Sequence, residues 1–439
     1  MTSEMSFSQS RLRVAEFDKA GHVLNKGRDL FMYSLFLFFP ILNAIADSTI
    51  YYFIDAYDSG LHLGLIRGGF LLLFIAVMGL GRILKCSINY VIIIFLFYLF
   101  LLSILSSNVN HSLFDGYLKW FVGLMMFPAG YWFFGDYESV VKYNFILVFA
   151  ALIICINLLI AQFTGYGMSA YGGEDFYTGG AGVGISNQLA LILLTYPVLI
   201  RNFDKFSHLK KMFIIIVGVL SLIFLILSMK RAGIIALAGG SIVFILITQS
   251  RTKAFKYIIT GFLVILMTLP LYKNILVKRY EARVSTFEKY DSEARYLEVF
   301  YVLDEFRDGN VWQKLFGKEA FNTGQFFGMK YFKRPRMIHG DFAALFYGTG
   351  IVGLGLYFSL FFTLFKRGVS KIRLLARVNP SREMLAVFIG LLFATFIISA
   401  TGSGTIGERC LVYSYFGAVL GSLKTLKQNQ PQPTLNMTS

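Results

Sequence analysis

The stretch Ile88–Ser106, INYVIIIFLFYLFLLSILS, decides the fold class of this chain. It contains no charged side chain and is about as long as the ~20 residues that a helix needs to cross a bilayer. Similar stretches fill most of the sequence, and 56% of the 439 residues are hydrophobic. A soluble protein of this composition would have too little polar surface, so we expect an all-α polytopic membrane protein.

The apolar stretches predict about twelve transmembrane helices. They cover roughly residues 30–46, 62–80, 88–106, 116–134, 144–163, 186–200, 212–229, 232–248, 258–274, 340–363, 384–402 and 410–424. We therefore expect this division of the chain: a tail at 1–29, nine helices in 30–274, a loop subdomain at 275–338, three helices in 339–424 and a tail at 425–439.

Basic residues fall on alternate connections, and this pattern predicts the orientation. The connections at 81–87, 201–211, 249–257 and 364–383 are rich in Lys and Arg, whereas those at 47–61, 107–115 and 164–185 contain neither. Short cytoplasmic loops carry the excess of Lys and Arg. Both termini are thus expected in the cytoplasm. The net charge of +16 fits inner loops that face anionic lipid, and no nucleic-acid motif is present.

The segment 275–338 is the longest of the expected extracytoplasmic connections. Within it, Asp291–Asp308 predicts an amphipathic helix that ends before Gly309. Its apolar residues follow helical spacing: Tyr296, Val299, Phe300, Leu303 and Phe306. We expect this stripe to lie on the membrane surface or against the ends of the spans.

The three cysteines, Cys86, Cys155 and Cys410, lie on different segments. They fit no disulfide or metal spacing and are interpreted as packing residues. The sequence therefore predicts neither a metal site nor a cofactor.

Several cations fall at the extracytoplasmic side, where positive charge is normally scarce. With His339, they are Arg67, Lys119, Lys230, Arg231, Arg295 and Arg409. Each also has a simpler explanation: Arg67 as a snorkelling or internally paired residue, Lys119 and Arg409 as headgroup anchors, and Lys230 as a solvated neighbour of Arg231. The basic run Lys333–Arg336 has two explanations as well, contact with substrate phosphate or with outer-leaflet lipid.

Cations at one membrane level suit the chemistry of a lipid diphosphate. Arginine offers paired N–H donors to phosphate oxygens, and fixed guanidinium groups stabilise charge on a departing diphosphate without a metal. A base must take a proton from the incoming sugar hydroxyl, and His339 is the candidate. Asp341, two residues on, is expected to orient the imidazole or to act as the base itself.

Several motifs resemble elements of the O-antigen polymerase and O-antigen ligase superfamily, which contains Wzy-type polymerases and lipopolysaccharide ligases. They are Leu227–Gly233 (LSMKRAG), Ser292–Arg295 (SEAR), Leu315–Gly317 (LFG), His339–Phe342 (HGDF), Tyr347–Leu354 (YGTGIVGL) and Asn187. The resemblance covers about residues 185–365. Lys230 stands where the family usually has Ser, and Gly340 where it has Asn.

The resemblance implies a metal-independent, inverting glycosyltransferase of GT-C-like fold in the bacterial inner membrane. Its donor and acceptor would be undecaprenyl-diphosphate-linked oligosaccharides, used at the periplasmic face. Carried over to this chain, Arg231 and Arg295 would bind the diphosphate, and His339 would be the base or position the acceptor. A chain-length regulator is a further partner that only the resemblance suggests.

We therefore expect a polymerase of O-antigen, capsule or exopolysaccharide. Catalysis is assigned to His339, Arg231, Arg295 and Asp341. Diphosphate binding is assigned to Arg67, Lys119, Lys230 and Arg409. One alternative is a ligase that transfers the glycan to lipid A-core. Another is a transporter or flippase of lipid-linked oligosaccharides, which would be expected to have related halves and charges near the midplane.

Overall fold

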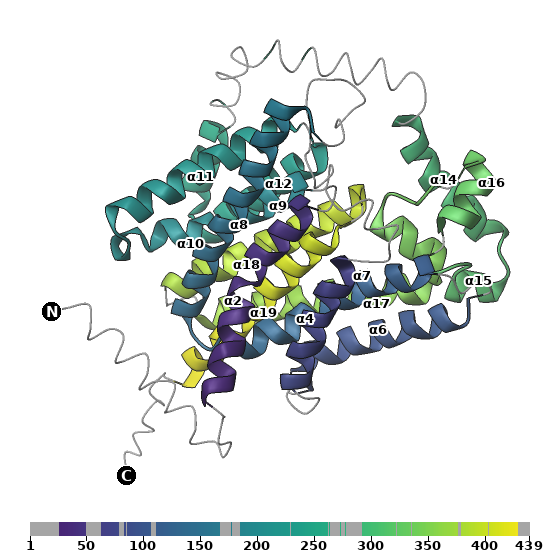
Figure 1. The fold of residues 1–439 in the computed structure, drawn as a ribbon, viewed down its shortest axis with the longest axis horizontal. Coiled ribbons are helices and arrows are strands. Elements are labelled where there is room, and N and C mark those ends of the chain that lie inside the picture. Colours follow the sequence, from purple (N-terminus) through teal and green to yellow (C-terminus); the bar gives the residue numbers. More distant parts are fainter. Residues whose placement is uncertain are drawn as a thin grey trace.

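The structure is a computed structural model, shown in Figure 1. It describes residues 26–49, 63–78, 83–106, 111–166, 185–261, 292–375 and 379–428, except for a few single positions, together with isolated residues between these ranges. Within these ranges every regular element is a helix. This confirms the all-α class.

The helices follow the chain in three groups. The first is α2 (Lys26–Thr49), α4 (Leu63–Met78), α6 (Ser87–Ile104), α7 (His111–Phe133), α8 (Tyr137–Thr164), α9 (Ile185–Leu193), α10 (Tyr196–Arg201), the short η3 (Phe203–Lys205), α11 (His208–Leu227) and α12 (Arg231–Thr248). The second is α14 (Ser292–Asp308), α15 (Val311–Phe316), η4 (Gly324–Gly328) and α16 (Met329–Phe332). The third is α17 (Asp341–Leu375), α18 (Asn379–Thr401) and α19 (Ile406–Gln428).

Among the described residues, 7 helices are long and apolar enough to cross a membrane. They are Leu30–Thr49, Ser87–Ile104, Tyr137–Thr164, His208–Leu227, Arg231–Thr248, Asp341–Lys371 and Arg382–Thr401. The chain is therefore compatible with a polytopic membrane protein. Four further expected spans coincide with α4, α7, the pair α9 and α10, and α19. The ninth expected span, 258–274, lies mostly outside the described residues.

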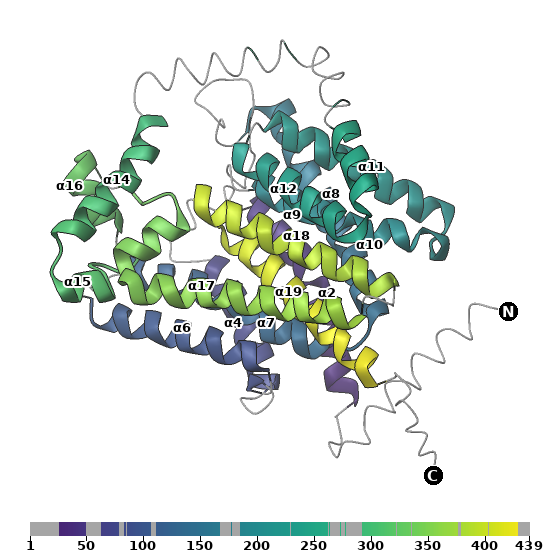
Figure 2. The same ribbon diagram turned by 180° about the vertical axis from the view of Figure 1, so that it is seen from behind.

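Helix α19 forms the centre of the bundle (Figures 1 and 2). Its residues from Gly407 to Leu423 are all buried, as expected of a helix that is surrounded by other helices. It packs most extensively along α7, where small residues let the two backbones approach. A Cβ atom on Gly417 would lie 2.1 Å from the carbonyl oxygen of Phe127, and one on Gly130 would lie 2.3 Å from that of Ser414. Such small-residue contacts are typical of helix packing in membranes.

The sixth expected span is not one continuous helix. It is divided into α9 and α10 by a turn at Leu194 and Thr195. The reason is Pro197, which has no N–H to donate to the carbonyl of Leu193 and whose ring disfavours the preceding helical turn. The hydropathy pattern does not detect this break because both halves are apolar.

Two glycine motifs that are far apart in the sequence meet at the start of α17. Gly350 interrupts this helix with φ 65° and ψ −165°, and Gly317 after α15 has φ 83°. A Cβ on Gly350 would lie 2.4 Å from the carbonyl oxygen of Leu315, so only glycine permits both the backbone angle and the approach. The backbone N–H of Lys318 donates to Tyr347 O at 2.9 Å, which fixes the loop to the helix.

Helices α14 to α16 form a small subdomain at the end of α6 and α17 (Figures 1 and 2). This end is opposite to the one where α2 begins and α19 ends. The subdomain has its own core of Val302, Phe327, Ile338 and Tyr347.

Helix α14 confirms the expected helix at 291–308, but its apolar stripe is not its buried face. Val299, Phe300 and Leu303 are 49%, 62% and 49% exposed, whereas Glu298 and Glu305 on the other face are buried. In the same stripe, Phe306 does pack against a span, with its ring centroid 4.7 Å from that of Phe346 in α17. Phe306 thus meets the expectation of contact with a span, whereas the membrane-surface location of the exposed residues stays a prediction.

Candidate functional site

His339 lies in the segment that joins the subdomain to α17, and a carboxylate of α14 holds its imidazole. Glu298 Oε1 is 2.9 Å from His339 Nδ1, and Glu298 Oε2 accepts the backbone N–H of His339 at 3.0 Å. The Glu298 side chain is 3% exposed, whereas that of His339 is 41% exposed. The ring is thus anchored at one nitrogen on a buried carboxylate while part of it remains accessible.

Arg336 is the third member of this cluster and binds the same oxygen of Glu298 as His339 Nδ1. Its Nε donates to Glu298 Oε1 at 2.8 Å, and its guanidinium carbon lies 4.9 Å from the ring centroid of Phe332. Arg336 is therefore turned into the protein, and the two roles expected for Lys333–Arg336, phosphate or lipid contact, do not describe it. A buried carboxylate needs such a cation to offset its desolvation.

The same contacts set the ionisation of Glu298. Burial by itself would raise the pKa of Glu298, but the hydrogen bonds from His339 and Arg336 stabilise the carboxylate and bring the pKa below its usual value. The group is therefore ionised at neutral pH and acts only as an acceptor.

Asp341 is used differently from the role expected for it. Its Oδ1 accepts a hydrogen bond from Arg409 at 2.9 Å, and its Oδ2 accepts from Ser399 Oγ and from the backbone N–H of Gly404, each at 3.2 Å. The Arg409 guanidinium also lies 3.9 Å from the ring centroid of Trp120. The orienting partner of the imidazole is Glu298, because the buried carboxylate of Asp341 is committed to the cation that neutralises it.

The first turn of α19 contacts three different polar groups through three consecutive residues. A Cβ on Gly407 would lie 2.1 Å from Asp47 Oδ2 in α2, a carboxylate that accepts a 2.6 Å hydrogen bond from Gln188 in α9. Glu408 lies beside Asn187 and within electrostatic range of Lys230. Arg409 points to Asp341. The turn therefore ties together the ends of several helices.

Glu408 also has a local explanation. Its carboxylate accepts the backbone N–H of Thr405 at 3.1 Å, and the Thr405 hydroxyl accepts the backbone N–H of Glu408 at 3.2 Å. This reciprocal pair is a capping box, which satisfies amide groups at a helix start. Glu408 is thus a capping residue whose carboxylate also lies within electrostatic range of Lys230.

The remaining predicted cations are placed as follows. Lys230 is the N-cap of α12 and Arg231 is its exposed first residue. Lys119 is half-buried on α7, next to Trp120. Arg67 lies in α4 and Arg295 in α14, but their side chains lie outside the described part of the chain. Of the predicted site residues, the structure therefore brings Asp341 and Arg409 into direct contact. Lys230 lies within electrostatic range of Glu408, the residue before Arg409 in α19.

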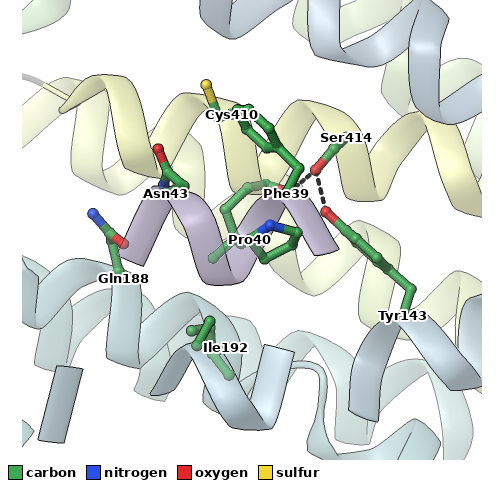
Figure 3. A pocket seen from close by; sticks show the side chains of 10 residues that line it. Phe39, Pro40, Asn43, Tyr143, Gln188, Ile192, Cys410 and Ser414 are labelled. Atoms are coloured by element: carbon green, nitrogen blue, oxygen red, sulfur yellow. Dashed lines mark hydrogen bonds between the residues drawn. The ribbon is translucent and has the colours of Figure 1, made fainter. Parts of the chain in front are cut away.

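A small cavity lies inside the bundle and is lined by residues of α2, α8, α9 and α19 (Figure 3). It has room for about one water molecule, with a volume of ≈ 10 Å³. Its lining includes Asn43, Gln188 and Cys410, and Tyr143 and Ser414 share a 2.6 Å hydrogen bond at its edge. The cavity is too small to hold a sugar. The expected extracytoplasmic connection 164–185 lies mostly outside the described residues.

Sequence reasoning missed Glu298 and Trp120. Glu298 falls on the face of α14 opposite the apolar stripe, where a carboxylate is normally solvated. The available signal is its seven-residue spacing from Glu305, which places two acids on one helix face. Trp120 has no distinguishing signal, because aromatic residues are frequent throughout the span 116–134.

Within the described residues, no three His, Cys, Asp or Glu side chains gather in a way that could hold a metal ion. The expected independence from metal stays a prediction. In the comparisons with known proteins, no family model matches this chain and no curated protein matches it.

Proposed function

We propose that this protein is a polysaccharide polymerase of the bacterial inner membrane, with its active site at the periplasmic face. It transfers an undecaprenyl-diphosphate-linked glycan to a sugar hydroxyl of another lipid-linked repeat unit. In this proposal α4, α7, the pair α9 and α10, and α19 also span the membrane, in a bundle of GT-C-like type with about twelve spans. Both termini lie in the cytoplasm, as the loop charges predict.

The observation that carries the proposal is the geometry of His339. Its Nδ1 is bound to the buried Glu298, while 41% of the side chain is exposed at the end of an apolar helical bundle. An imidazole that is held at Nδ1 by a carboxylate presents Nε2 as a general base. That base is located where a lipid-linked sugar would meet the protein.

The reaction follows from these groups. The acceptor hydroxyl loses its proton to His339 Nε2, and its oxygen forms a bond to the anomeric carbon of the donor. The bond from that carbon to the diphosphate breaks, and the diphosphate leaves with the electron pair. Arg231 and Arg295, assisted by Lys230, Lys119 and Arg67, stabilise the charge that grows on the leaving oxygen.

Arg409 and Asp341 take a different role in this scheme. Both side chains are buried and bound to each other, at 9% and 4% exposure. We assign them to holding α17, α18 and α19 together behind His339, in place of the diphosphate contact and the base that the sequence suggested.

The test uses the purified full chain in lipid nanodiscs with undecaprenyl-diphosphate-linked repeats as the only substrate. Longer lipid-linked chains on a gel support the polymerase. Growth that requires added lipid A-core would instead identify a ligase. Movement of intact donor across a vesicle membrane without any lengthening would identify a transporter. A chelator such as EDTA should leave the rate unchanged, and strong inhibition would contradict the metal-free mechanism.

A further inference from the structure

The carboxylate of Glu298 makes two contacts with one residue. One oxygen accepts the backbone N–H of His339 and the other faces its Nδ1. Both the position and the rotation of the imidazole are thereby fixed from the same group. From this geometry we infer that Glu298 is the positioning residue of His339, which holds the neutral ring as the Nδ1–H tautomer and directs Nε2 to the acceptor.

The chemistry of the three partners requires this tautomer. An ionised carboxylate has no proton to donate, and the guanidinium of Arg336 occupies the same Oε1 as a donor. Nδ1 must therefore carry the hydrogen of the neutral ring. Nε2 is then the nitrogen with the lone pair, as a general base needs.

The surroundings make the arrangement rigid. Glu298 is one turn before Val302, and Val302 packs with Ile338, the residue that precedes His339, in the subdomain core. Arg336 rests on the ring of Phe332. Glu298 and His339, the two partners of the hydrogen bond, are therefore both held next to the same subdomain core. Loss of the Glu298 carboxylate should release the imidazole of His339 without moving the backbone far.

The chain supplies a matched control in Glu305, two turns further on the same face of α14. Its side chain is 4% exposed and binds Lys318, Lys330 and Tyr331. It resembles Glu298 in burial and in its ion pairing, but no described contact joins it to a histidine. A substitution there should disturb the subdomain to a similar degree without acting on His339.

The experiment measures the tautomer directly by two-bond ¹H–¹⁵N correlation spectra of the ¹⁵N-histidine-labelled full chain in nanodiscs. The chain has only 5 histidines, and His339→Gln assigns the signal. The neutral ring of the unmodified protein should be the Nδ1–H form. Glu298→Gln should shift it toward the Nε2–H form, because the carboxamide cannot accept from all three donors at once. Glu305→Gln should leave the His339 signal unchanged.

A second readout rests on the proposed function. Glu298→Gln should lower kcat of chain extension by about 10²-fold, within the range that a positioned general base contributes, with KM for the donor unchanged. Glu298→Asp should recover part of kcat. If Glu298→Gln does not insert stably, Glu298→Gln/Arg336→Gln removes the carboxylate and its buried cation together and gives the same spectroscopic comparison.

The outcomes separate the two proposals. An unchanged His339 tautomer in Glu298→Gln overturns the inference, whatever the activity, and so does an unchanged kcat in a protein that extends chains. If Glu298→Gln shifts the tautomer but the unmodified protein extends no chains, the role of Glu298 on His339 is supported and the polymerase is overturned.

Discussion

Glu298 contacts His339 in space, and Asp341 follows His339 by two residues in the chain; both carboxylates are buried. They differ in what they bind. Glu298 shares its charge between a buried arginine and a histidine that is 41% exposed, whereas Asp341 is closed in a pair with the buried Arg409. The pair of Glu298 and His339 includes an accessible side chain that can contact a substrate. The pair of Asp341 and Arg409 is buried at both residues and is suited to holding helices together.

Removal of the accessible partner should give the largest effect on activity. His339→Ala should lower the rate of chain extension by about 10²–10⁴-fold, the contribution of a general base, with donor binding retained. Glu298 would keep its contacts with Arg336 and with the backbone, so the unfolding temperature should change little. The control is His208→Ala, an exposed histidine at the start of α11. Normal product from His339→Ala would remove this residue from the mechanism.

Removal of one member of the sealed pair should instead reduce stability. Asp341→Ala leaves the charge of Arg409 buried and uncompensated, which costs about 3–5 kcal/mol. We expect a lower unfolding temperature in detergent. The double substitution Asp341→Leu/Arg409→Met should recover most of the loss, because an apolar pair of similar volume is often neutral or stabilising. If the double variant is as unstable as the single one, the ion pair is not what holds these helices.

The two arginines Arg231 and Arg409 differ in the same way, because Arg231 is exposed whereas Arg409 is buried. Arg231→Ala should lower chain extension by about 10²–10³-fold, the cost of removing one group that stabilises the departing charge. The protein should remain inserted and abundant on an immunoblot of membranes. Arg251→Ala, at an exposed position past the other end of α12, is the matched control. Equal effects of the two substitutions would contradict a site-specific role.

The smallest expected effect concerns acid. Burial alone would raise the pKa of Glu305, but the contacts with Lys318, Lys330 and Tyr331 bring it to about 2. A carboxylate with a depressed pKa stabilises the fold at neutral pH, and this contribution is lost as pH falls from about 4.5 toward 2. Pepsin should therefore cut the subdomain faster over this window, relative to an unfolded reference peptide. In Glu305→Gln the acid-dependent part of this increase should be smaller; the same increase would assign the loss to other groups.

The sequence predicted the helices better than their surroundings. Hydropathy placed α6 and α12 close to their observed positions, and the cap and stop residues placed α14 within one residue at its start. Hydropathy could not detect the break before Pro197, because apolarity continues through it. It also could not identify the buried face of α14. Periodicity shows that a helix has two faces, but not which of them faces protein and which faces lipid or water.

The candidate site was predictable only in part. The sequence singled out His339 and Arg409 by their place on the sparsely charged side. It expected Asp341 to orient the imidazole or to act as the base, whereas the Asp341 carboxylate binds Arg409. The true pairings join residues 41 and 68 positions apart, Glu298 with His339 and Asp341 with Arg409. Such contacts depend on how α14, α17 and α19 pack, and no local spacing encodes them.

By itself, the sequence determined that this chain is a bundle of apolar helices, because transfer of apolar side chains from water depends on composition and is nearly independent of partners. The tertiary structure alone decided which acid meets which base. A buried charge is stable only beside a counter-charge with hydrogen-bond geometry, and that partner is brought by a different helix.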